Sequence, residues 1–351
     1  MKVSGLAHVL PSKVITNEDV IRSLRCESSK YLASTEVDQL AEMTHAAFLR
    51  AGTKIRYQLA EGEKPYELCR RAGVEALAQA GLAPADIDLV LYASIGRGFI
   101  EPATANVFQD LLGLRNATCY DVIDACASWL RAIEIAQTYI AAGGRYRNVM
   151  VITGEFISRY AYRYGLRSLD EFQHWFPGVT VGEAATATVL SREPDGRDDF
   201  SADFRTWGEK RALCLIPFEN CLDYLGAATP NGATLTPLRF ASFGGEILRF
   251  GSSKLVSHFR QADDFNRRDY DIVFGHPASD GICATIGRRC GLDFSKFQFT
   301  HHLFGNTASS SVPLAMSIAR QADRLKDGSR VLVLFASAGL STVLMRFVWR
   351  G

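Results

Sequence analysis

The 351-residue sequence predicts an α/β protein, and three observations support this class. Short β-branched and apolar runs alternate with longer helical patterns, as in proteins with parallel or mixed sheets. A hydrophobic fraction of 47% and a charged fraction of 22% are typical of a globular chain with a large core. Two stretches of the second half resemble two stretches of the first half, which indicates an internal duplication.

The first half contains two helices and three strands that the pattern predicts with clear ends. The second helix has an apolar stripe made of Leu130, Ile133, Ala136 and Ile140. In chain order, the elements are a helix over 66–80 that ends at Gly81, the strand DIDLVLYAS (86–94), the strand YDVID (120–124), the striped helix that ends at Gly143-Gly144, and the strand NVMVITGE (148–155).

The second half repeats this order. DYDIVFGHPAS (269–279) resembles the strand DIDLVLYAS, and the segment from GNTASSSVPLAM to VLVLFASAG resembles the striped helix with its following strand. Aligning Asp88 with Asp271 gives an offset of 183 residues, and aligning Cys126 with Asn306 gives 180. We therefore expect an N-terminal half over 1–190 and a C-terminal half over 191–351, with the boundary near the polar turn at 193–201.

Residues 156–180 are rich in aromatic residues and arginine and have little periodicity. We expect this segment to be a loop or cap over a site.

The composition argues against several classes of protein. A net charge of +1 gives no basic footprint for nucleic acid or an anionic membrane, so a small molecule or a protein is the expected partner. The chain has no run of about 18 apolar residues and no signal-like start, so we expect a cytoplasmic protein without a membrane span. The eight cysteines show neither CxxC pairs nor zinc spacing, which argues against a disulfide framework and a structural metal.

The stretch DACASWL (124–130) places Cys126 between a strand and a helix. Unpaired N–H groups and the dipole at a helix N-terminus stabilise a thiolate and can lower a cysteine pKa to ~3.5–7.5. The small neighbours would leave room for an acyl group, and Asp124 could cap the helix. Cys126 is therefore a candidate nucleophile, and a buried structural thiol is the alternative.

The second half contains three residues that could assist such a nucleophile. His276 lies at a strand end in FGHPAS, Asn306 precedes a helix rich in small residues, and Gly339 follows the strand VLVLF. A nucleophilic cysteine needs a base or an electrophilic partner, which His276 could supply, and a glycine N–H can approach a ligand closely. A hydrogen-bonded structural histidine, a helix cap and a tight turn are the alternatives. The chain has no GxSxG, P-loop, HExxH or GxGxxG motif, so it lacks the usual signals of hydrolases, NTPases, zinc peptidases and dehydrogenases.

Taken together, these motifs resemble the thiolase superfamily, and specifically β-ketoacyl-ACP synthase III, over essentially the whole chain. The stretches that carry the resemblance are SGLAHVLPSKVITNEDV, AGTKIRYQ, EPATANVFQDLLGL, DACASWLRAIEIAQTYI, GHPAS, FGNTASSSVP and AGLSTVLMRFVW.

The resemblance implies a duplicated five-layer αβαβα fold, a homodimer and acyl transfer from an acyl-CoA or acyl carrier protein thioester to Cys126. It implies that His276 and Asn306 stabilise the enolate of a second thioester, and that the N–H groups of Cys126 and Gly339 hold the first oxyanion. It implies no cofactor beyond these thioesters and no metal.

The sequence departs from the family pattern at several positions. Pro277-Ala278-Ser279 follow His276, where the family usually has Gln-Ala-Asn, and GEAATATVL (182–190) replaces GDGAGAVVL. The family's coenzyme A-stacking tryptophan has no counterpart between Ser28 and Arg56. These departures favour a role in specialised metabolism, in polyketide or fatty acid biosynthesis.

Glu101 in GFIEPATA is the most informative departure. This setting is similar to that of the head-to-head condensing enzyme of olefin synthesis, in which a partner-subunit glutamate serves as a base. A surface carboxylate near the dimer contact is the alternative.

We therefore expect a condensing enzyme that forms a β-keto product by a Claisen reaction. An acyltransferase to an alcohol or amine is one alternative. A non-catalytic partner subunit and a hydroxymethylglutaryl-type synthase are the others.

Overall fold

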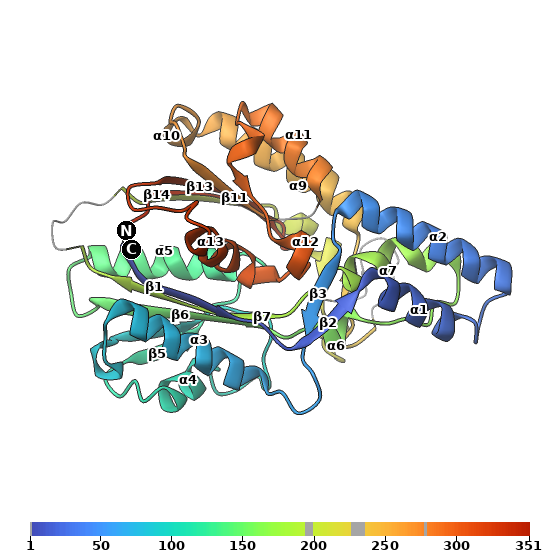
Figure 1. Cartoon of the computed structure of the whole chain (residues 1–351), viewed down its shortest axis with the longest axis horizontal. Coiled ribbons are helices and arrows are strands. Elements are labelled where there is room, and N and C mark those ends of the chain that lie inside the picture. The colour runs from blue at the N-terminus through green and yellow to red at the C-terminus, as the bar shows by residue number, and fades with distance from the viewer. Residues whose placement is uncertain (1, 194–198, 226–235, 277–278) are drawn as a thin grey trace.

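The computed structural model describes residues 2–193, 199–225, 236–276 and 279–351, and two five-stranded sheets form its centre (Figure 1). The first sheet has the order β1-β7-β6-β4-β5, with β1 (Lys2–Val9), β4 (Leu89–Tyr92), β5 (Thr118–Asp121), β6 (Asn148–Glu155) and β7 (Ala184–Ser191). The second has the order β12-β11-β13-β14-β8, with β8 (Ser201–Thr206), β11 (Ile272–Gly275), β12 (Phe297–Gln298), β13 (Arg330–Ser337) and β14 (Ser341–Val348).

Both sheets have the same pattern of strand directions. The sheet of the first half pairs β5, β4 and β6 in parallel and adds β7 and β1 antiparallel. The sheet of the second half pairs β12, β11 and β13 in parallel and adds β14 and β8 antiparallel. The domain boundary expected at 190/191 falls at the end of β7, and residues 194–198 of the predicted polar turn lie outside the described residues.

Helices form three layers around the two sheets (Figure 1). The central layer consists of α5 (Ser128–Ala141) and α13 (Ser311–Gln321). The outer face of the first sheet carries α3 (Pro65–Ala80) and α4 (Ala105–Leu111), and that of the second carries α9 (Gly244–Gln261), α10 (Asp263–Asn266) and α11 (Asp280–Cys290). The duplicated five-layer αβαβα fold is confirmed.

The apolar stripe explains the position of α5. Leu130, Ile133, Ala136 and Ile140 are buried in one core cluster that also includes Phe335 and other residues of the second sheet. A helix that is apolar on one face must bury it, and the space between two sheets accepts apolar residues on both sides. This central layer joins the two halves into one body.

In the structure, several paired elements share one offset. Leu89 and Ile272, which begin β4 and β11, are 183 positions apart, as are Ser128 and Ser311, which begin α5 and α13. Asp88 and Asp271 both accept a backbone N–H at the start of the next parallel strand.

This offset corrects one prediction. Ala125 and Ala308 both have a positive φ, and they too are 183 positions apart. The residue equivalent to Cys126 is therefore Ser309, and not Asn306 as the sequence alignment suggested.

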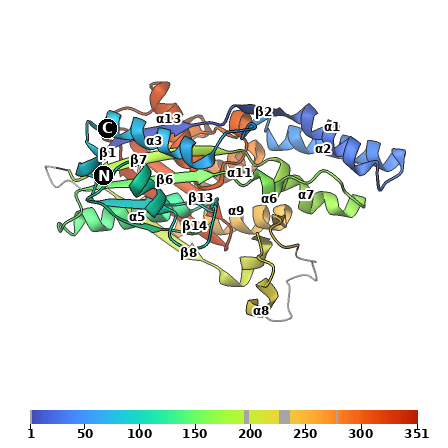
Figure 2. The same ribbon diagram turned by 90° about the horizontal axis from the view of Figure 1, so that it is seen from below.

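A third group of elements lies beside one end of the sheets (Figure 1). It contains β2 (Lys13–Thr16), β3 (Ile55–Gln58), α1 (Asn17–Ser28), α2 (Ser34–Ala51), α6 (Ser158–Ala161), α7 (Phe172–Val179), β9 (Cys214–Leu215), β10 (Ala241–Ser242) and α12 (His301–Phe304). Another helix, α8 (Cys221–Leu225), lies apart from the sheets (Figure 2). Segment 156–180, expected as a loop or cap, is partly helical because it contains α6 and α7.

Other predicted elements agree with the structure except at their ends. The helix over 66–80 is α3 and ends at Gly81, whose φ of +65° is left-handed. The strand predicted at 120–124 ends at Asp121, because the chain turns sharply before Cys126. No disulfide joins the eight cysteines, all of which lie among the described residues, and Cys26 is exposed.

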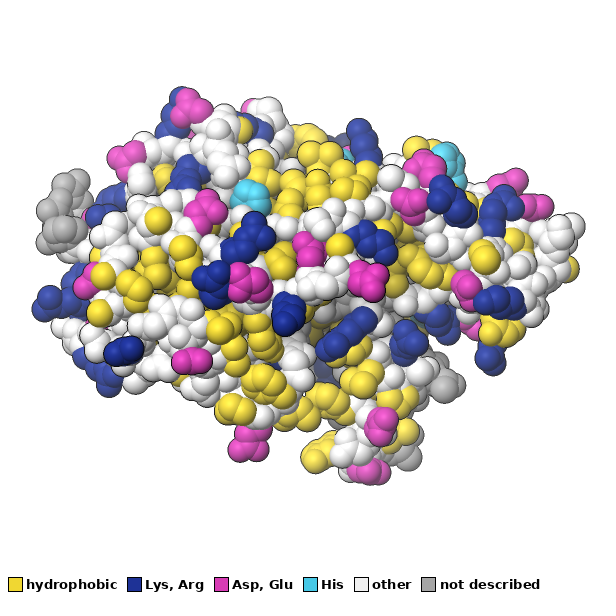
Figure 3. All heavy atoms as spheres, turned by 60° about the horizontal axis from the view of Figure 1, so that its bottom comes forward, with side chains coloured by type: hydrophobic (Ala, Val, Ile, Leu, Met, Phe, Trp, Pro, Cys, Tyr) yellow, Lys and Arg dark blue, Asp and Glu magenta, His cyan; other side chains and the backbone are white. Residues whose placement is uncertain are grey.

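The surface carries charges of both signs. Lysine and arginine side chains lie among aspartate and glutamate side chains on the face shown in Figure 3, without a large patch of one sign. No helix among the described residues is long and apolar enough to cross a membrane.

Candidate active site

One cavity of about 880 Å³ receives three of the five predicted site residues, namely Cys126, His276 and Asn306. Cys126 follows β5, His276 follows β11, and Asn306 lies between α12 and α13. Because β5 and β11 are parallel strands of their sheets, their carboxyl ends open on the side where α/β proteins usually bind ligands. The duplication therefore brings strand ends of both halves to one site.

A sharp turn presents Cys126 to the cavity. Ala125, the preceding residue, has a φ of +46°, a left-handed conformation that is costly for alanine and is found at functional turns. The Ala127 N–H donates to the Asp124 carbonyl at 2.9 Å and to Ser337 Oγ at 3.2 Å. Because Ser337 ends β13, the second half of the chain holds the turn that bears the thiol.

Burial raises the pKa of the Cys126 thiol, and Cys214 and Glu155 add to this effect. The backbone N–H groups of Cys126 and Ala338 hydrogen-bond the sulfur and oppose it. The sequence predicts a lowered pKa at a helix N-terminus. The structure differs because α5 begins two residues later, at Ser128, and because removal of water penalises the thiolate.

Asp124 does not cap α5, as the sequence suggested it could. Ala127 occupies the N-cap position, and Asp124 Oδ2 accepts a hydrogen bond from Arg131 Nε at 3.2 Å. This ion pair joins the turn before α5 to the first turn of the helix.

His276 is packed as a neutral imidazole. Its ring stacks on Phe335 with centroids 4.6 Å apart, and its Nδ1 is buried. Burial lowers the pKa of His276 to about 4, and His301 contributes to the decrease. A neutral imidazole offers one N–H donor to an oxyanion without carrying charge into the cavity.

The backbone of Asn306 is fixed by a loop of the first half. Its N–H donates to the Thr180 carbonyl at 2.8 Å, and its carbonyl accepts from the Gly182 N–H at 3.0 Å. Its Oδ1 accepts from the Ala308 N–H at 2.9 Å, which caps the turn before α13. The cap expected from the sequence is therefore present, and it leaves the Nδ2 amide group as the donor for a ligand.

Gly339 stands one residue beyond the cavity. Ser337 and Ala338 line the cavity, and the Ala338 N–H hydrogen-bonds the thiol. The turn does require glycine at 339, where φ is +125°.

Glu101 is exposed on the loop between β4 and α4 and does not line the cavity of its own chain. Hydrogen bonds hold the ends of this loop. The Gly98 N–H donates to Tyr66 Oη at 2.8 Å, and the N–H groups of Thr104 and Ala105 donate to the Asp121 carboxylate, each at 2.8 Å. The loop thus projects Glu101 outward from a fixed base.

Glu155 is buried behind the site, where it contributes to the raised pKa of Cys126, and it was missed by sequence reasoning. Its buried carboxylate accepts from Ser309 Oγ at 2.5 Å and from the Ile95 and Gly96 N–H groups at 3.2 and 3.4 Å. Burial raises its pKa, and these donors oppose the increase. A carboxylate at the end of the apolar strand NVMVITGE was the available signal, because such a group is buried only with partners.

The rest of the cavity is mainly apolar and extends under α7 and α9. Cys214 also lines it, and burial raises the pKa of this thiol to about 12. The apolar lining includes Ile157, Phe172, Phe176, Val181, Leu215, Ile216, Phe240, Ile247, Leu248, Leu255, Ile282, Ile286, Phe297 and Phe299. Pro277 and Ala278, where the sequence departs from the family, lie outside the described residues.

Family models match both halves of the chain. The model described as 3-oxoacyl-[acyl-carrier-protein (ACP)] synthase III matches residues 120–208, which include Cys126. The model of the C-terminal part of the same synthase matches residues 261–349, which include His276 and Asn306. Together these ranges span just over half of the chain.

Curated relatives match almost the full length. The chain is 27% identical over 343 residues to a β-ketoacyl-[acyl-carrier-protein] synthase III of Desulfitobacterium hafniense, a match that covers 97% of this chain and 95% of the relative. It is 23% identical over 352 residues to that of Clostridium acetobutylicum, with 99% and 98% covered.

Solved structures share the fold. Xanthomonas campestris OleA, in a variant with bound lauric acid and lauroyl-CoA, has a TM-score of 0.83 at 22% identity and covers 99% of this chain and 98% of its own. Aquifex aeolicus 3-oxoacyl-[acyl-carrier-protein] synthase III has a TM-score of 0.78 at 22% identity, with 99% of both chains covered.

Proposed function

We propose a Claisen condensation of two acyl thioesters as the reaction of this chain, which belongs to the β-ketoacyl-[acyl-carrier-protein] synthase III-like condensing enzymes of the thiolase superfamily. The observation that carries the proposal is the shared cavity of Cys126, His276 and Asn306. This cavity brings together a nucleophile, two groups that can donate to an oxyanion, and an apolar chamber. Two-step acyl transfer requires these features.

In the first step, Cys126 takes the acyl group. Its sulfur bonds to the carbonyl carbon, the thioester bond of the donor breaks, and the thiol proton passes to the departing thiolate. The exchange creates no net charge overall, because the nucleophile and the leaving group are both thiols. The backbone N–H groups beside the sulfur would hold the oxyanion of the tetrahedral intermediate.

In the second step, a second thioester becomes an enolate. The His276 imidazole and the Asn306 amide would donate to its oxygen, and the enolate carbon would attack the acyl carbon on Cys126. The carbon–sulfur bond then breaks, which releases a β-keto thioester and returns the proton to the thiol. A neutral His276 suits this role, because an N–H donor stabilises developing negative charge without being a competing acid.

Glu101 of a second copy is the proposed base for this step. The chain presents Glu101 outward beside β5, which is an edge strand of its sheet and could pair with a second copy. Ile123 lines the cavity and is 60% exposed, so the wall is open on this side. A homodimer in which the glutamate of each chain enters the cavity of the other would close that opening. The glutamate could then deprotonate the α-carbon of the second thioester, so that decarboxylation of a malonyl unit would be unnecessary.

We propose a medium or long acyl chain as the donor substrate. A cavity of about 880 Å³ with apolar walls far exceeds what an acetyl group fills, and each buried methylene contributes about 0.8 kcal/mol. A variant of OleA, which shares the fold, has been crystallised with bound lauric acid and lauroyl-CoA. Arg50 at the cavity offers a cation for the phosphate that coenzyme A and acyl carrier protein both carry. Specialised metabolism is the proposed setting.

The test is product identification. Purified protein is incubated with acyl-CoA and acyl carrier protein thioesters of two to sixteen carbons, alone and with malonyl thioesters, and products are identified by mass spectrometry. We expect a β-keto thioester or the β-keto acid released from it. An ester or amide formed with added alcohols or amines would favour the acyltransferase alternative, and a chain that accepts no acyl group would revive the non-catalytic subunit.

A further inference from the structure

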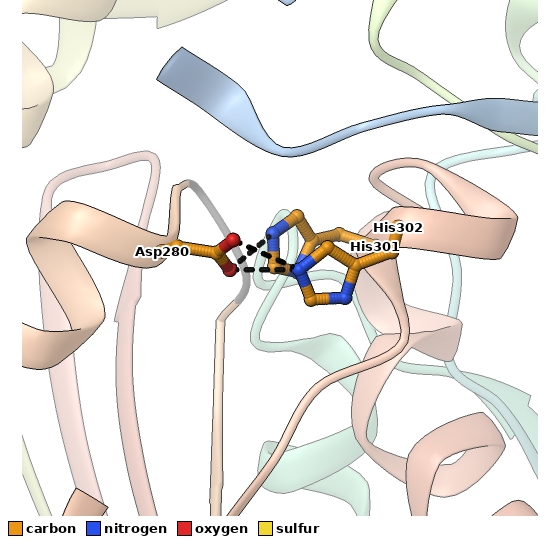
Figure 4. Close-up of side chains that lie close together, drawn as sticks. All are labelled: Asp280, His301 and His302. Atoms are coloured by element: carbon orange, nitrogen blue, oxygen red, sulfur yellow. Dashed lines mark hydrogen bonds and ion pairs between the residues drawn. The ribbon is translucent and has the colours of Figure 1, made fainter. Parts of the chain in front are cut away.

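A cluster of metal-ligating side chains lies beside the active-site cavity, at a place where two helices begin (Figure 4). Asp280 is the first residue of α11, and His301 and His302 are the first residues of α12. One ligand atom from each residue lies within 4.8 Å of the others. Asp280 Oδ1 is 2.8 Å from His302 Nε2 and 3.2 Å from His301 Nε2.

His301 is the unusual member of this cluster. Its side chain is 1% exposed, and its Nε2 lies 3.2 Å from Asp280 Oδ1 without the geometry of a well-directed hydrogen bond. The Ala51 backbone is another polar neighbour. A buried imidazole that faces a carboxylate in this way is suited to bind an ion between the two groups. In Figure 4 its imidazole lies against that of His302 and faces the Asp280 carboxylate.

Gly52, which follows α2, leaves the space over the cluster clear. A Cβ atom at this position would lie 2.8 Å from Asp280 Oδ2 and 3.3 Å from His301 Nε2. Its φ of +80° also favours glycine, so both the backbone and the cluster disfavour a side chain here. The Asp280 side chain is half exposed, which gives an ion and water a route to the cluster.

We propose that Asp280, His301 and His302 bind one divalent transition-metal ion, with zinc as the best fit. Two imidazole nitrogens and one carboxylate oxygen are borderline and hard donors that suit Zn²⁺, Co²⁺ or Ni²⁺ and disfavour Ca²⁺ and Mg²⁺, which prefer oxygen alone. Three protein ligands leave a fourth position for water or another ligand. No local sequence pattern indicates this site, because Asp280 is separated from the histidines by a helix and a strand.

An ion at this site would hold two segments that serve the active site. Residue 280 follows His276 by four positions, and α12 leads directly to Asn306. A metal bridge between the start of α11 and α12 would therefore restrict both proposed oxyanion donors. The binding itself does not depend on the proposed condensation, so the two proposals can fail separately.

The test is metal titration of tag-free, chelator-treated protein. Co²⁺ is followed by its visible absorption bands, and Zn²⁺ by calorimetry and by metal analysis of the purified protein. The variants are Asp280→Asn and His302→Gln, and the control is Asp203→Asn. The control alters another histidine–carboxylate pair, in which Asp203 Oδ2 lies 3.0 Å from His258 Nε2. Melting curves confirm that each variant folds.

We expect one ion per chain and binding at least about tenfold weaker in Asp280→Asn and His302→Gln, since even outer-shell partners contribute 10–100-fold. Asp203→Asn should bind as the unaltered chain does. The proposal is wrong if both cluster variants bind with unchanged affinity, if no saturable binding occurs, or if cobalt–thiolate charge-transfer bands place the ion on cysteine.

Discussion

At the residue scale, Cys126 and His276 are both driven to their neutral forms by the same burial. The pKa of the thiol rises and the pKa of the imidazole falls to about 4, so neither group is charged near pH 7. A thiolate–imidazolium pair is therefore not the resting state of this site. The chemistry proposed above needs none, because a thiol exchanges with a thiol and a neutral imidazole donates a hydrogen bond.

The roles of Cys126 and His276 can be separated by substitution. We expect His276→Ala to retain acylation of Cys126 and to lower the condensation rate by about 10²–10³-fold, the usual effect of losing one oxyanion donor. Rapid-quench mass spectrometry would follow the acyl-enzyme and the product in one experiment. Equal loss of acylation and condensation would contradict the division of roles.

Glu155 should make stability depend on pH. Burial raises its pKa above the ordinary value of 4.5, so the folded chain keeps this proton at pH values where the unfolded chain has lost it. Stability from this group is then fully present below pH 4.5 and is lost as pH rises through the raised pKa.

We expect Glu155→Gln to remove that decrease. Urea unfolding from pH 4 to 8 would show the difference in unfolding free energy between the two chains changing with pH in this direction. The exposed control Glu61→Gln should track the unaltered chain. A pH-independent difference between Glu155→Gln and the unaltered chain would refute the assignment.

Sequence reasoning found the residues that have a local signature and missed those that act from a distance. Cys126 and Asn306 lie in recognisable motifs, and the structure brings them to one cavity with His276. Glu155, Ser337 and Cys214 reach the site through tertiary packing, which no local pattern records. The direction of the Cys126 pKa was wrong because dehydration by the surrounding chain opposes the local helix effect.

At the element scale, strands and helices with strong periodicity were predicted well. The strand at 148–155 matches β6, because its apolar run is bounded by polar residues. Helix α7 was missed because Pro177 and Gly178 lie inside its last turn and hide its pattern. Its placement over the cavity nevertheless agrees with the cap expected for 156–180, because Phe172 and Phe176 line the wall.

Helix α9 should set the acyl chain length, since Leu248 projects into the cavity wall. We expect Leu248→Trp to shorten the preferred donor by several carbons, because the added ring takes the volume of the distal methylenes, each worth about 0.8 kcal/mol of binding. Acylation rates across the same thioester panel would measure the shift. Leu49→Trp, at a position 72% exposed, is the control. An unchanged chain-length profile in Leu248→Trp would place the acyl chain elsewhere.

At the scale of the whole molecule, the duplication determines where the site lies. Two copies of one strand-and-helix pattern pack around the α5 and α13 layer, and the cavity opens where their strand ends meet. Sequence repetition predicted the two halves and gave two offsets, 183 and 180, and the element starts in the structure agree with 183. The proposed role of Glu101 would be a property of an assembly, and the single chain shows only that this residue is exposed.

Mixed dimers test whether Glu101 acts in the cavity of the other chain. We expect Cys126→Ala and Glu101→Ala homodimers each to lose condensation. A heterodimer that contains one chain of each kind should keep one complete site and recover up to half of the activity per dimer. Co-expression with two different tags isolates this species. Failure to recover activity in a stable heterodimer would show that Glu101 serves its own chain or has no catalytic role.

The central claim is that Cys126 receives the acyl group, and intact-mass spectrometry with peptide mapping tests it most directly. The protein is incubated with single acyl donors, and the same is done with Cys126→Ala and with Cys214→Ala, which removes the other thiol proposed to face the cavity. We predict one acyl adduct on Cys126 in the unaltered chain and in Cys214→Ala, and none in Cys126→Ala. An adduct on Cys214, or none with any donor, would contradict the account.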